Sequence, residues 1–116
     1  MARFVSVKPE YTGGGIYIFT GELKDGNYFV ADTSFYDVRI LNADPNEAIW
    51  DDGCYNMDSM EWQDEHLVEF LEPEKAKKFL ISMLNWIKRH KPDGVCMGSD
   101  LDYFLADVKS LHGNWR

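Results

Sequence analysis

His66 and Glu69 place an imidazole and a carboxylate three positions apart, and such groups serve as acid/base pairs or as metal ligands. On a strand, residues three positions apart point to opposite faces, so these two side chains would not converge on one ion. Further carboxylates that could bind Ca²⁺ or Mg²⁺ are Asp51, Asp52, Asp58, Glu61 and Asp64. The Asp-x-Asp-x-Asp-Gly spacing of calcium-binding hands is absent, and we therefore predict no metal site and no cofactor.

Thiol chemistry would require Cys54 or Cys96 to lie near a base, and the sequence places none of its three histidines beside either cysteine. The glycine run Gly13–Gly15 precedes a strand-like stretch and lacks the Lys-Ser/Thr ending of a phosphate-binding loop. Neither a Gly-x-Ser-x-Gly nor a His-Glu-x-x-His motif occurs. We predict no catalytic residue, and the sequence favours a non-enzyme.

Charge is distributed very unevenly along the chain. Residues 44–74 hold eleven of the twenty acids and no Lys or Arg, whereas the remaining nine acids and all twelve basic residues leave the rest at +3. Within this acidic segment, aromatic and Met side chains alternate with carboxylates. Aromatics supply burial on association, and the surrounding charge steers a partner of opposite sign.

This combination predicts a small acidic, non-catalytic binding protein that engages a basic protein surface through residues 44–74. The expected binding residues are Trp50, Asp51, Asp52, Tyr55, Asp58, Glu61, Trp62 and His66. Another interpretation is that the segment is only a covering loop, whose apolar residues fold over the sheet while its acids are solvated.

Two further alternatives belong to other functional classes. The carboxylates and His66 could meet only in three dimensions, which would make the protein an enzyme or a divalent-metal-binding protein. The stretch Lys75–Lys91 carries six Lys and Arg and no acid, so it could pair with the acidic segment of a second copy. That arrangement would make the chain a structural subunit of a homodimer or larger homo-oligomer.

Bulk properties exclude several classes. A chain of 116 residues with 45% hydrophobic residues can bury a core, and nothing divides it, which predicts a single domain over residues 1–116. A net charge of −8 disfavours contact with nucleic acid or an anionic membrane. The sequence shows neither a signal-peptide core nor a membrane-spanning run, so a cytoplasmic protein is expected.

The elements that would position these residues begin with strands. We expect strands at Arg3–Val7, around Ile16–Phe19 and around Tyr28–Val30, the last two joined by a turn at Lys24–Asn27 that contains an Asp-Gly pair. Alternation of apolar and charged residues over Phe35–Leu41 predicts a half-buried strand. A further strand is expected at His66–Leu71.

Two helices are expected in the C-terminal third. Pro73 suits a first helical turn, and apolar residues recur every three or four positions up to about His90. A near capping box at Ser99–Asp102 predicts a second helix over about 100–112 with Gly113 at its end. The fold class is thus α+β: an antiparallel β-meander of four to five strands, with one strand near 66–71, packed against two C-terminal helices at about 73–90 and 100–112.

Overall fold

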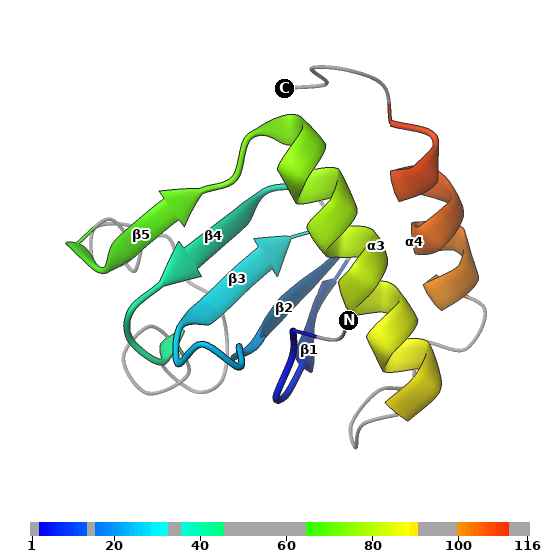
Figure 1. Ribbon diagram of the computed structural model, residues 1–116. Helices are drawn as coiled ribbons and strands as arrows, with labels where there is room; N and C mark the ends of the chain where they lie inside the picture. Colours follow the sequence, from blue (N-terminus) through cyan, green and yellow to red (C-terminus); the bar gives the residue numbers. More distant parts are fainter. Residues whose placement is uncertain (1–2, 14–15, 33–35, 46–64, 91–99, 112–116) are drawn as a thin grey trace.

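The computed structural model describes residues 3–13, 16–32, 36–45, 65–90 and 100–111, and it has the α+β architecture that the sequence predicts (Figure 1). Five strands form one antiparallel sheet in the order β1-β2-β3-β4-β5. The elements are β1 (Lys8–Gly13), β2 (Ile16–Glu22), β3 (Tyr28–Asp32), β4 (Val38–Leu41), β5 (Leu67–Phe70), α3 (Pro73–His90) and α4 (Asp100–Lys109). Both helices lie on the same face of the sheet.

The hairpin between β2 and β3 forms as predicted. Gly26 has a φ of 91°, which L side chains rarely adopt, and its N–H donates to the Leu23 carbonyl at 3.0 Å. The Asp25 carboxylate accepts the Asn27 N–H at 3.0 Å, a local bond that stabilises the turn. Residues 24–27 therefore set the register of β2 against β3.

The strand expected at Arg3–Val7 is wrong, and β1 begins at Lys8 instead. Residues 3–6 run antiparallel alongside the end of β2 without forming a regular strand: the Val5 N–H donates to the Glu22 carbonyl at 2.8 Å, and Phe4 forms an isolated bridge with Leu23. Only a glycine fits at position 21, because a Cβ there would collide with the Ser6 carbonyl oxygen. Pro9 lies in β1, which is an edge strand and so tolerates a residue without an N–H.

Strand β4 is shorter than expected and starts at Val38. Tyr36 precedes it with a φ of 56°, a left-handed conformation that interrupts the strand predicted over Phe35–Leu41. The strand near 66–71 is confirmed as β5, whose register against β4 shifts between Ile40 and Leu41.

Helix α3 supplies more buried residues than any other described element, and its start and end agree with the sequence-based expectation. Its buried stripe is Ala76, Phe79, Leu80, Met83, Leu84, Trp86 and Ile87. The Phe79 ring packs edge-on against Phe29 of β3 at 5.0 Å and against Phe4 at 5.2 Å between ring centroids. The Arg3 guanidinium lies 4.9 Å from the centre of the same ring.

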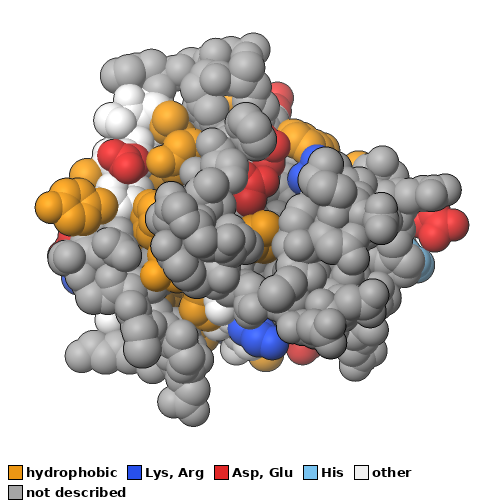
Figure 2. All heavy atoms as spheres, turned by 180° about the vertical axis from the view of Figure 1, so that it is seen from behind, with side chains coloured by type: hydrophobic (Ala, Val, Ile, Leu, Met, Phe, Trp, Pro, Cys, Tyr) orange, Lys and Arg blue, Asp and Glu red, His pale blue; other side chains and the backbone are white. Residues whose placement is uncertain are grey.

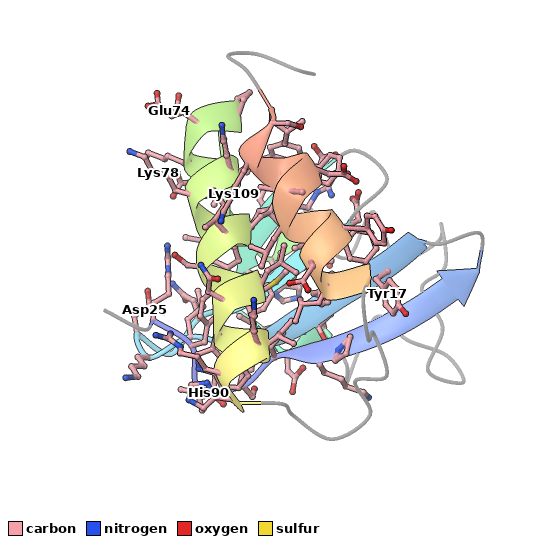
Figure 3. The ribbon with its side chains drawn as sticks, turned by 90° about the vertical axis from the view of Figure 1, so that its right-hand side faces the viewer. Tyr17, Asp25, Glu74, Lys78, His90 and Lys109 are labelled. Carbon is pink, nitrogen blue, oxygen red and sulfur yellow. The ribbon has the colours of Figure 1, made fainter. Side chains whose placement is uncertain are left out.

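Helix α4 packs antiparallel to α3, over the β2 side of the sheet (Figure 3). Lys88 near the end of α3 pairs with Asp102 near the start of α4 at 3.3 Å. At the other end, the Lys77 ammonium donates to the Leu111 carbonyl at 2.6 Å. Tyr17 of β2 meets Phe104 of α4 edge-on at 5.5 Å. The second helix is confirmed from Asp100 to Lys109, and Gly113 lies outside the described residues.

The sheet also buries side chains on the face away from the helices, which the sequence does not predict. Ile18, Val30 and Leu41 are at most 6% exposed and form a second apolar cluster with Leu67. These residues alternate along their strands with those that meet α3, so they point to the opposite face. Neither helix of the described chain is long and apolar enough to cross a membrane.

The close approach of Ser6 to Gly21 of β2 gives a test of the fold. Gly21→Ala should lower the free energy of unfolding by about 3 kcal/mol, because the new methyl group meets a backbone carbonyl and, 2.7 Å away, the Phe29 ring. Gly26→Ala is the control: no atom lies within 4 Å of its Cβ, and only the positive φ costs about 1 kcal/mol. Urea denaturation measures both. Equal losses in the free energy of unfolding for the two variants would contradict the close approach of Ser6 to Gly21.

Candidate interaction surface

The binding residues expected from the sequence divide into two groups. Seven of them lie outside the described residues, namely Trp50, Asp51, Asp52, Tyr55, Asp58, Glu61 and Trp62. His66 is described, together with both ends of the acidic segment. These ends are Asp44 and Pro45 after β4, and residues 65–74 around β5 and the start of α3. The geometry of the candidate surface therefore comes from these two described ends of the segment.

His66 connects the two described ends of the acidic segment through contacts with Asn42. Its ring Nδ1 lies 3.0 Å from the Asn42 side-chain oxygen, and its carbonyl accepts the Asn42 N–H at 3.0 Å. These contacts join the end of β4 to the start of β5, so the chain leaves the sheet after Asn42 and returns at His66 in nearly the same place. His66 thereby has a positioning role at the base of the acidic segment.

Glu69 pairs with the first turn of α3. Its carboxylate accepts a bond from the Lys75 ammonium at 3.3 Å. Both side chains of this ion pair are about half exposed, so it contributes at most about 1 kcal/mol. Across the ranges that the structure describes, no three His, Cys, Asp or Glu residues gather as a metal site would require.

Strand β5 is the last strand of the sheet that the described residues form, and it exposes large apolar side chains. Val68 is 51% exposed and Phe70 is 39% exposed. Val68 has no Cα partner on β4, because Ile40 and Leu41 pair with Glu69 and Leu67 on either side of it. Val68 is thus the extra residue of a β-bulge, a device common at sheet edges.

Acidic side chains surround this apolar edge. Glu65, Glu69, Glu72 and Glu74 are all exposed, and Lys75 is the one Lys or Arg in the stretch from 65 to 75. Seen from behind the sheet, acidic side chains project beside a histidine at one margin of the molecule (Figure 2). The Arg39 guanidinium lies 4.7 Å from the centre of the Phe70 ring, which orders this aromatic at the surface. Apolar and acidic groups thus share one sheet edge.

A second notable feature, Tyr36, has no signal in the sequence. Its left-handed φ costs a non-glycine residue about 1–2 kcal/mol, and its ring packs against the core. Burial raises the pKa of the Tyr36 phenol above its ordinary value, and the Asp107 carboxylate on α4 raises it further. The sequence pattern placed Tyr36 in a strand because the alternation of apolar and charged residues does not report φ.

Comparison with protein-family models, curated proteins and solved structures finds no match to this chain. The candidate surface therefore rests on the residues and contacts described above.

The raised pKa of Tyr36 predicts how stability depends on alkaline pH. Below the ordinary phenol pKa of 10.0 the group is neutral in the folded and unfolded states and contributes no pH dependence. As pH rises above this value the unfolded state ionises first, so the free energy of unfolding falls until the folded pKa is passed. Denaturation at increasing alkaline pH should show a shallower fall for Tyr36→Phe than for the unmodified protein.

Two variants separate the causes of that pH dependence. Asp107→Asn removes the carboxylate beside the phenol and should give an intermediate slope. Tyr103→Phe removes the hydroxyl of a tyrosine that is 68% exposed and should leave the slope unchanged. An unaltered slope in Tyr36→Phe would refute the assignment.

Proposed function

We propose that the protein is a small acidic, non-catalytic binding protein that engages a basic surface on another protein. The observation that carries this proposal is the continuity between the acidic segment and an exposed apolar edge. Residues 44–74 hold eleven acids and no Lys or Arg, and the described end of this segment includes β5 with its exposed Val68 and Phe70. Apolar contact area beside charges of a single sign is suited to a partner of opposite charge.

The tie between Asn42 and His66 supports the proposal because it anchors both ends of the acidic segment at one edge of the sheet. Asp44 and Glu65 therefore flank the same tie between two strands, although 21 positions separate them in the sequence. Concentrating carboxylates in one region raises the local negative potential, which attracts a basic partner and accelerates association. Aromatic residues of the same segment, such as Trp50 and Trp62, would add burial to the contact.

The proposal predicts that binding of a basic partner depends on where the carboxylates lie in the chain, and not on the total charge of the protein. Replacing Asp51, Asp52 and Asp58 by Asn should weaken binding of a Lys/Arg-rich peptide by about tenfold at low salt, with the difference shrinking at high salt. The matched control replaces Asp25, Asp102 and Asp107 by Asn, which removes the same three charges from outside the segment. Calorimetric titration at two salt concentrations measures the effect. Equal weakening by both triple variants would leave only a general charge effect and would contradict the proposal.

A further pair of substitutions tests the apolar contribution. Trp50→Ala with Trp62→Ala should weaken binding at low and at high salt alike, because apolar burial is not screened by ions. Retained affinity at both salt concentrations would show that the aromatics take no part. If instead a divalent ion raised the unfolding temperature and His66→Ala abolished that rise, the protein would be a metal-binding protein.

A further inference from the structure

The outer edge of β5 is the feature of the described surface that most directly indicates how a partner is held. Sheet edges are sites where another chain can add a strand through main-chain hydrogen bonds, and proteins commonly protect them with short strands, bulges and charges. Strand β5 has four residues, a bulge at Val68 and Glu69 beside it. It nevertheless exposes about half of Val68 to solvent.

We propose that β5 receives a basic, extended segment of the partner as an additional strand, so that exposed Val68 and Phe70 are covered by the partner and the surrounding glutamates face its Lys and Arg residues. This inference rests on the proposed function and adds the conformation of the partner and the place where it binds.

The charge around β5 selects the occupant. Glu65, Glu69, Glu72 and Glu74 outnumber the two cations at this surface, Lys75 and Arg39, and opposite charges on neighbouring strands stabilise their pairing. A second copy of the chain is a poor occupant, because pairing β5 with β5 would bring both sets of four glutamates together. Like charges directly opposite each other destabilise a strand pair. The same carboxylates that oppose self-association therefore favour a basic strand.

Arg39 contributes to this surface through the Phe70 ring. The two residues are paired across β4 and β5, and the guanidinium lies 4.7 Å from the ring centre. A ring already held in place loses less side-chain entropy when a partner covers it. Phe70 is therefore positioned as an apolar contact for a strand laid along β5.

The experiment uses the full chain and a short peptide in which Lys alternates with Val and Thr. A control peptide of identical charge carries a central Pro, which cannot donate a main-chain hydrogen bond. We expect the alternating peptide to bind at least about tenfold more tightly than the Pro peptide, and to slow amide hydrogen exchange around Val68. Equal affinities, or unchanged exchange around Val68, would overturn strand addition.

Two valines provide matched variants of the protein. Val68 and Val5 are 51% and 52% exposed, so Val68→Lys and Val5→Lys make the same chemical change at equally exposed sites. Val68→Lys should weaken binding of the alternating peptide by about tenfold, whereas Val5→Lys should change it less than about twofold. Equal effects of the two variants would overturn the placement on β5. Urea denaturation of both variants confirms that each is folded.

The outcomes separate this inference from the proposed function on which it rests. If Val68→Lys has no effect but neutralising Asp51, Asp52 and Asp58 still weakens binding, strand addition is wrong and the proposed function survives. If neither peptide binds at low salt, the proposed function itself fails. Sedimentation of the free protein tests whether a second copy of the chain pairs with β5. A concentration-dependent dimer that Val68→Lys abolishes would show that the second copy, and not a basic partner, binds this edge.

Discussion

Three phenylalanine rings hold the two layers of the protein together. Phe79 of α3 packs edge-on against Phe29 of the sheet and against Phe4 of the N-terminal residues 3–6. Phe4 and Phe29 also contact each other, with 5.5 Å between ring centroids. All three are at most 3% exposed, so the cluster combines apolar burial with favourable ring geometry. Helix α3, the central strands and the N-terminus therefore depend on one another for their positions.

The arrangement of the helices determines which parts of the sheet remain available. Both helices lie on one face, and α4 covers the side of β2, where Tyr17 meets Phe104. Strand β5 lies at the opposite margin, and its side chains range from half-buried to exposed. At the margin that joins the acidic segment, the apolar side chains of Val68 and Phe70 thus reach solvent. The tie between Asn42 and His66 fixes this relation, because it returns the chain to the sheet beside the strand it left.

The proposed specificity for a basic partner and the expected resistance to self-association would have the same physical origin, namely the glutamates around β5. Exposed apolar groups at a sheet edge would by themselves favour pairing with any strand, including that of a second copy. The glutamates around Val68 and Phe70 add an unfavourable term for acidic or identical strands and a favourable one for basic strands. Their screening by salt links the proposed function to a measurable dependence on ionic strength.

Local patterns of the sequence were sufficient for the hairpin at Asp25-Gly26, for helix α3 from Pro73 to His90 and for the α+β class, because turn chemistry and helical periodicity depend on near neighbours. The acidic segment was also evident from composition, whereas all eight of its expected binding residues remain predictions, and seven of them lie outside the described ranges. Tertiary structure decided that residues 3–6 lie alongside the end of β2 without forming a regular strand, and that Tyr36 adopts a positive φ. It also made β5 the strand that exposes Val68, since a place at the margin of a sheet follows from pairing between distant segments.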